Sequence, residues 1–136
     1  MSESIFQFPI RVYYEDTDAG GIVYYANYLK FCERARTEWL RLLGISQSKF
    51  LEQNIGFVVT KVAMSNLASA RLDDLLNVKT EIKTLKRASI IFNQQIINQE
   101  KVKLCEVEVN VACVDFNKNK PIAIPSFILG ALESVS

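Results

Sequence analysis

Two periods of apolar residues run along this chain, and the change between them separates one long helix from several strands. After Asn27, apolar residues recur three or four positions apart, as on one face of an α-helix: Tyr28, Phe31, Cys32, Ala35, Trp39, Leu42 and Leu43. The other face is charged: Lys30, Glu33, Arg34, Arg36, Glu38 and Arg41. We predict a helix of about 17 residues, roughly 25 Å long, with Asn27 as its N-cap and Gly44 as the C′ residue that ends it.

Most of the remaining chain has the alternation, or the β-branched and aromatic content, that is typical of strands. The predicted strands are residues 5–15, 57–64, 78–84, 89–97 and 101–116. In the last of these, one face carries Cys105, Val107, Val109, Val111 and Cys113, and the other face carries Glu106, Glu108 and Asn110. Val102 and Leu104 fall out of phase with this alternation, which predicts a β-bulge near Cys105.

Turn residues and one proline refine this picture. Pro9 cannot donate a ladder hydrogen bond, so the first strand is expected at an edge of the sheet, with a bulge, or with a late start. Turns are predicted at Asp73-Asp74 and at residues 98–101 and 117–121. Short helices are expected within residues 46–54 and after Pro125.

The length of the last strand indicates how the elements assemble. Residues 101–116 would span about 50 Å if the strand were flat, whereas strands usually have about five or six residues. A strand of this length must curl. We therefore predict an α+β fold in which a curved antiparallel sheet wraps around one long central helix.

Length and charge restrict the classes of function. The 136 residues form one expected domain, residues 1–136, which can bury a core without a metal or disulfide. The 16 basic and 15 acidic residues are interspersed, so no nucleic-acid partner is expected. The N-terminus lacks the features of a signal peptide, and no apolar stretch approaches the roughly 18 residues of a membrane span. We expect a soluble, cytoplasmic protein without membrane insertion.

The cysteine and histidine contents restrict the chemistry further. Cys32, Cys105 and Cys113 show no CxxC spacing and lie in apolar patterns, so we expect reduced, buried thiols. The chain has no histidine, which removes Ser-His-Asp and Cys-His catalysis and the usual zinc hydrolase sites. General acid–base chemistry would then depend on a carboxylate, a lysine, a tyrosine or bound water.

The segment Asp16-Thr17-Asp18, followed by Gly20-Gly21, is the strongest candidate for chemistry. Such residues are common in turns where strands end. A D-x-D pair after a strand also occurs in phosphotransferases with an aspartyl nucleophile, but these need a parallel sheet and a second carboxylate cluster, for which Asp73-Asp74 is the only candidate. In a third interpretation, a carboxylate faces the free N–H groups at the start of the helix, as in a hydrolytic site.

The longest motif resolves these interpretations through a resemblance. Residues 14–28, YEDTDAGGIVYYANY, followed by FCERARTE at 31–38, resemble hot-dog-fold acyl-CoA thioesterases. The most similar branch is the tol-pal-associated YbgC type, related to 4-hydroxybenzoyl-CoA thioesterases. The likeness extends more weakly through residues 72–80, 112–115 and 120–125. Many members of the YbgC branch have histidine where Tyr25 stands, and the benzoyl-CoA branch has tyrosine.

The resemblance implies the hot-dog fold and hydrolysis of acyl-CoA, with short acyl chains favoured. Asp18 matches the catalytic aspartate of the family, and the backbone N–H of Tyr25 matches the oxyanion donor. A thioester is electrophilic and its thiolate leaves readily, so one carboxylate suffices, as nucleophile or as general base. Asp16 is expected to hold the loop through backbone N–H groups. No metal or cofactor is expected, since coenzyme A is part of the substrate.

The family resemblance also implies subunits that share sites. We expect a dimer, assembled further into a dimer of dimers, that is, a homotetramer. Val59 and Thr60 are candidate contributions of the partner subunit to the acyl pocket. Lys86 and Arg87 are candidates for the coenzyme A phosphates, although a solvated charged turn is the simpler interpretation.

Three alternatives remain at this point. The acyl group could be aromatic, as Tyr25 suggests, or it could be carried by an acyl-carrier protein. The domain could also be a non-catalytic acyl-carrier or lipid-binding module of the same fold. The intact Asp18 and Gly20-Gly21 argue against this last alternative.

Overall fold

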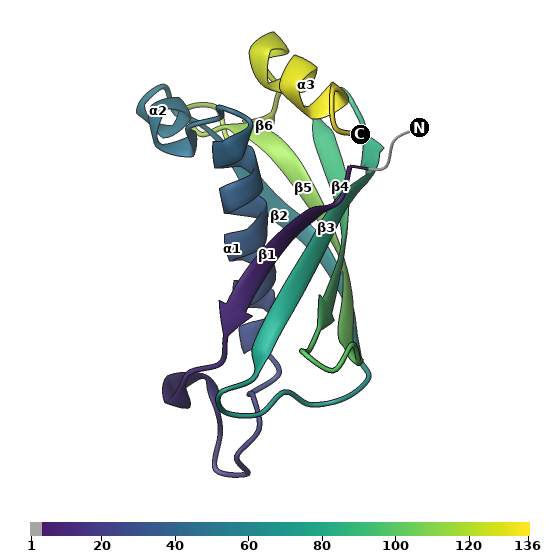
Figure 1. The fold of residues 1–136 in the computed structure, drawn as a ribbon. Helices are drawn as coiled ribbons and strands as arrows, with labels where there is room; N and C mark the ends of the chain where they lie inside the picture. Colours follow the sequence, from purple (N-terminus) through teal and green to yellow (C-terminus); the bar gives the residue numbers. More distant parts are fainter. Residues whose placement is uncertain (1–3) are drawn as a thin grey trace.

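In this computed structural model, one antiparallel sheet curls around a single long helix (Figure 1). The structure describes residues 4–136. Residues 1–3, on which the expectation of no signal peptide partly rests, lie outside the described residues. The strands follow the order β1-β3-β4-β5-β2, with β6 beside β5. Their bounds are β1 Phe6–Arg11, β2 Ile55–Asn66, β3 Leu75–Leu85, β4 Ser89–Ile97, β5 Lys103–Asp115 and β6 Lys120–Pro121. The helices are α1 Asn27–Leu42, α2 Gln47–Glu52 and α3 Ser126–Glu133.

The predicted architecture, a curved antiparallel sheet with one long helix, is confirmed. The first strand is shorter than residues 5–15, because the chain leaves β1 at Arg11 and turns through a 3₁₀ helix at Tyr14–Asp16. Pro9 lies in an edge strand, since β1 pairs only with β3. The short helices expected within residues 46–54 and after Pro125 are α2 and α3.

Three β-bulges increase the local twist of the sheet. In β5, Lys103 pairs with Ile97 and Cys105 pairs with Ile96, so Leu104 is the extra residue. Both Leu104 and Cys105 are buried, which confirms the predicted bulge and explains the break in alternation. The other two bulges lie at Thr60 in β2 and Lys83 in β3.

Helix α1 buries a stripe that advances three or four residues at a time: Tyr28, Phe31, Cys32, Ala35, Arg36, Trp39 and Leu40. The Trp39 ring stacks on Phe6, with centroids 5.9 Å apart, and meets the edge of Phe92 at 6.4 Å. Two positions were wrongly assigned from the sequence. Arg36 is buried, and Leu42, which comes one residue before the next position of the stripe, is 73% exposed.

The predicted end of α1 is confirmed, but its predicted N-cap is wrong. Gly44 has φ +85°, its N–H donates to the Arg41 carbonyl, and the Ile45 N–H donates to the Leu40 carbonyl. This is the Schellman arrangement, with Gly44 at C′ as predicted. Asn27 is not the N-cap but the first residue of the helix, because its side chain bonds elsewhere.

The three cysteines are buried and free, as expected. Burial raises the pKa of the Cys32 thiol to about 12 and that of Cys105 to about 11. They therefore act as small apolar groups of the core. Within residues 4–136, each helix is too short or too polar to span a bilayer.

Two glycine substitutions test the helix ends. No atom lies within 4 Å of a Cβ built at either Gly44 or Gly130, so crowding affects neither. We expect Gly44→Ala to lower the free energy of unfolding by about 1–2 kcal/mol, because φ is positive there. We expect Gly130→Ala, inside α3, to raise it by about 0.5–1 kcal/mol. Urea unfolding measures both, and effects of equal sign would contradict the assigned backbone conformations.

Candidate active site

The loop between β1 and α1, residues 12–26, lies at one end of the sheet and is held by Asp16. The carboxylate oxygen Oδ2 of Asp16 accepts the Tyr13 N–H at 2.8 Å. The Asp16 carbonyl accepts the Tyr24 N–H at 3.0 Å and the Asn27 side-chain amide at 2.9 Å. Asp16 therefore ties the start of the loop to the start of α1, which is the structural role predicted for it.

Asp18 lies at the tip of this loop with an exposed carboxylate. Its Oδ1 accepts the Gly20 N–H at 2.8 Å, and its backbone N–H donates to the Ile22 carbonyl at 2.9 Å. Gly21 has φ +79°, and a Cβ at Gly20 would lie 3.3 Å from Asp18 Oδ1. The second carboxylate oxygen, Oδ2, accepts no hydrogen bond from the part of the chain that is described. One oxygen is thus held in place while the other is available.

The backbone N–H of Tyr25 is the oxyanion donor predicted from the sequence. The Tyr24 N–H donates to the Asp16 carbonyl and the Asn27 N–H donates to the Tyr24 carbonyl. The N–H groups of Tyr25 and Ala26, which lie between them, have no acceptor among residues 4–136. The Tyr25 N–H precedes the first turn of α1, where the helix dipole favours negative charge. This N–H can therefore donate a hydrogen bond to an acceptor from outside the chain.

A second loop, residues 67–74, is hydrogen-bonded to the first loop and to α1. The Val23 N–H donates to the Ala70 carbonyl, and the Ala70 N–H donates to the buried Tyr28 hydroxyl, both at 2.9 Å. Ile22 and Arg71 form an isolated antiparallel bridge. Burial raises the pKa of the Tyr28 phenol, so it stays protonated. The helical pattern predicted only a packing role for Tyr28, and the contact of its hydroxyl with a distant loop was missed.

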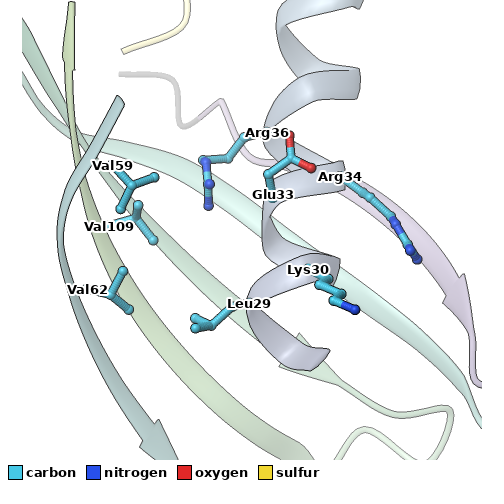
Figure 2. Close-up of a pocket in the computed structure, with 8 residues that line it drawn as sticks. All are labelled: Leu29, Lys30, Glu33, Arg34, Arg36, Val59, Val62 and Val109. Atoms are coloured by element: carbon cyan, nitrogen blue, oxygen red, sulfur yellow. The ribbon is translucent and has the colours of Figure 1, made fainter. Parts of the chain in front are cut away.

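A groove of about 480 Å³ runs along α1 from its first turn, between the helix and strands β2 and β5 (Figure 2). Its apolar wall consists of Leu29, Val59, Val62 and Val109. Its polar lining consists of Lys30, Glu33, Arg34 and Arg36. The volume lies within the range of about 300–1,000 Å³ that is usual for small-molecule sites.

The structure separates the other candidate residues. Val59 lines the groove, and Thr60 is the bulged residue beside it, whose hydroxyl donates to the Asn110 carbonyl. Lys86 and Arg87 lie in the β3–β4 turn, at the opposite end of the sheet from Asp18 (Figure 1). The register explains this, because β1 ends beside Leu75, at the start of β3, and Lys86 follows the end of β3. Within one chain, these cations cannot reach Asp18.

A metal site is not formed by the residues described here. Across residues 4–136, no three His, Cys, Asp or Glu side chains gather closely enough to hold an ion. Asp16 and Asp18 each accept one backbone N–H with one carboxylate oxygen, but Asp16 is half-buried, whereas Asp18 is exposed.

Comparisons with known proteins agree with this geometry. The sequence profile of the thioesterase-like superfamily matches residues 12–132. The "Acyl-CoA thioester hydrolase YbgC" of Escherichia coli O6:H1 is 49% identical, over 98% of this chain and 99% of its own. A crystal structure of a probable thioesterase from Bartonella henselae has a TM-score of 0.80 at 33% identity, covering 90% of this chain and 100% of its own. A 1,4-dihydroxy-2-naphthoyl-CoA thioesterase from Synechocystis has a TM-score of 0.91 at 21% identity, covering 96% and 97%, which supports the hot-dog fold.

Two matched tyrosine substitutions test the support of the loop. Tyr28→Phe removes the acceptor of the buried Ala70 N–H, and we expect it to lower the free energy of unfolding by about 1–3 kcal/mol. Tyr25→Phe removes a hydroxyl from a ring that is 57% exposed, and we expect a change within about 0.5 kcal/mol. Denaturant titration measures both, and hydrogen exchange should show faster exchange at Ala70 in Tyr28→Phe alone. Unchanged protection at Ala70 would contradict this contact.

Proposed function

The chain belongs to the thioesterase-like superfamily, and from this membership we propose that it hydrolyses acyl-CoA thioesters with Asp18 as the reacting carboxylate. The observation that carries the proposal is that one loop presents two groups. These are the exposed Asp18 carboxylate, of which only one oxygen accepts a hydrogen bond, and the Tyr25 N–H, which has no acceptor among residues 4–136. The first can attack or activate water, and the second can hold the negative charge that develops on the thioester oxygen.

The proposed reaction has two possible first steps. In one, Asp18 Oδ2 attacks the carbonyl carbon, the C–S bond breaks to release coenzyme A thiolate, and water hydrolyses the resulting anhydride. In the other, Asp18 takes a proton from a water molecule that attacks the carbonyl. In both, the oxyanion accepts the Tyr25 N–H, a contact typically worth about 2.7–4 kcal/mol. Neither step uses a metal, because the thiolate leaves without one.

The groove along α1 is the proposed place of the acyl chain. It starts at Leu29, in the first turn of the helix that follows Tyr25, and its wall is built from Val59, Val62 and Val109. An apolar wall next to the proposed carbonyl site suits short aliphatic acyl groups, which the resemblance to the YbgC branch also favours. Aromatic acyl groups are the second candidate. A panel of acyl-CoA and acyl-carrier thioesters, compared by kcat/KM, distinguishes them.

We also propose that the protein is a symmetric dimer joined at β2. This strand is 12 residues long and, among residues 4–136, pairs only with β5, so its other edge is open to that part of the chain. Val58, Val59 and Val62 are 37%, 45% and 40% exposed. A long, apolar, unpaired edge is usually covered by another chain. Pairing of two such dimers would give the tetramer, and a neighbouring copy could bring Lys86 and Arg87 to the coenzyme A phosphates.

Asp18→Asn and Asp16→Asn together test the assignment. Asp18→Asn removes the negative charge with little change of shape, so we expect kcat to fall at least about 10²-fold with a smaller change in KM. In Asp16→Asn, the amide oxygen can still accept the Tyr13 N–H, and the loss should not exceed about 1.5–3 kcal/mol. Thiol release, followed with EDTA present, measures both.

The two variants must retain the oligomeric state and thermal midpoint of the wild type. Near-normal kcat in Asp18→Asn with a large loss in Asp16→Asn would show that the wrong carboxylate was assigned. Activity that disappears with EDTA and returns with zinc or magnesium would contradict the metal-free reaction.

Val58→Asp tests the dimer, because it places a charge on the open edge of β2. We expect the wild type to be at least dimeric at micromolar concentration by light scattering, and Val58→Asp to shift it toward the monomer. Leu42→Asp is the matched control: Leu42 is even more exposed but lies at the end of α1, and the oligomer should persist. A monomeric wild type would contradict the proposal.

A further inference from the structure

The buried arginine of α1 is the strongest unexplained feature of the molecule. Arg36 is only 9% exposed. Its Nη1 donates to Gln94 Oε1 at 2.9 Å. The Gln94 amide nitrogen donates in turn to the Cys32 carbonyl and the Thr80 hydroxyl, each at 2.9 Å. The guanidinium is thus fixed in position by a neutral amide that is itself fully occupied.

No ion pair within residues 4–136 includes Arg36. The ion pairs of that region join Arg41 to Glu38, Lys83 to Glu108 and Lys103 to Glu106, all near the surface. Glu33, one turn earlier on α1, bonds the Thr37 hydroxyl instead. Burial lowers the pKa of Arg36, and Cys32 and Glu33 act in the opposite direction. A buried charge is costly unless it is paired, so a counter-charge from outside this chain would be strongly favoured.

The Arg36 guanidinium lies over the Phe92 ring, with Cζ 6.0 Å from the ring centroid, and the side chain also borders open space. Arg36 lines the 480 Å³ groove and also a smaller cavity of about 100 Å³, which share Glu33, Arg36 and Val59. Figure 2 shows the Arg36 side chain extending from α1 toward Val59 and Val109, whereas Lys30 and Arg34 extend away from these strands. Arginine has five N–H donors, and only one hydrogen bond of the Arg36 side chain is accounted for.

We propose that Arg36 is a specificity-determining residue that binds a carboxylate at the far end of the acyl group. The preferred substrates are then acyl-CoA thioesters of dicarboxylic acids rather than of simple fatty acids. This inference rests on the proposed function and narrows its substrate class. The planar guanidinium suits a carboxylate better than an ammonium would, because two parallel N–H···O bonds can form.

The position of the guanidinium fits a short chain. Side chains of a helix lean toward its N-terminus, and Gln94 links Arg36 to the carbonyl of Cys32, one turn back. Cys32 is five residues after Asn27, the first residue of α1, which is about 7.5 Å along the axis, and Tyr25 lies two residues before Asn27. A short acyl group that starts at Tyr25 and lies in the groove would therefore bring its far end close to Arg36.

Matched substrates test the proposal. Glutaryl-CoA is compared with pentanoyl-CoA, and adipyl-CoA with hexanoyl-CoA, since each pair has the same number of carbons. We expect the wild type to favour the carboxylated member by kcat/KM, and Arg36→Met to lower that ratio at least about tenfold. Arg36→Lys keeps the positive charge but loses the planar guanidinium, so we expect an intermediate ratio of kcat/KM values. If Arg36→Met does not fold, a lowered ratio in Arg36→Lys still supports the proposal and an unchanged ratio still contradicts it.

Arg41→Met is the control, because Arg41 lies on the same helix but pairs with Glu38 at the surface. It should leave the ratio unchanged. A wild type that hydrolyses the unsubstituted chains equally well or better would overturn the inference and leave the proposed function intact. The inference is also overturned if Arg36→Met lowers kcat/KM equally for the carboxylated and the unsubstituted thioesters. It is overturned as well if Arg36→Met changes the oligomeric state without changing the ratio, since Arg36 would then serve a subunit contact.

Calorimetric titration of Asp18→Asn separates binding from hydrolysis. We expect this variant to bind glutaryl-CoA more tightly than pentanoyl-CoA, and Asp18→Asn with Arg36→Met to lose the difference. If the wild type hydrolysed neither thioester but Asp18→Asn still bound glutaryl-CoA more tightly, the proposed function would be wrong and the proposed role of Arg36 would be supported. Equal binding of the two thioesters would overturn the role of Arg36.

Discussion

The burial of one face of α1 against the curled sheet is the constraint on which the rest of the structure depends. The chain has one long helix, and its stripe from Tyr28 to Leu40 can leave water only against the sheet. Contacts of Trp39 with Phe6 and Phe92 join the helix to strands that lie two places apart in the sheet. Because the helix is held along its length, its first turn has a fixed position relative to the strand ends.

That fixed first turn gives the loop that carries Asp18 a stable anchor. Residues 12–26 would be free to rearrange if they were anchored only at β1, but three elements hold them. Asp16 bonds both sides of the loop, Asn27 joins it to α1, and Tyr28 holds Ala70, which bonds Val23. The backbone contacts leave the Asp18 carboxylate exposed, as the proposed reaction requires. Rigidity therefore comes from the surroundings of Asp18 rather than from Asp18 itself.

The same packing leaves one side of the molecule incomplete. Within residues 4–136, strand β2 has an open edge, and the groove between it and α1 is lined by the buried Arg36, which forms no ion pair there. A core that was designed for stability alone would place an apolar residue at position 36, since buried charges seldom stabilise a fold. Arg36 is instead supported by Gln94 and Thr80, both fully buried. Such a supported polar group, facing a cavity, is more easily explained by binding than by folding.

The helices and strands could be predicted from the sequence, because their signals are local. The alternation of β5 gave its buried face and the bulge at Leu104, Gly44 marked the end of α1, and the long motif around Asp18 indicated the loop and its family. Tertiary structure alone decided the contacts between segments far apart in sequence. It placed Arg36 inside, because Gln94, 58 residues away, offers it an acceptor. It likewise gave Asn27 a role in the loop rather than at the cap, and separated Lys86 from Asp18 by the length of β3.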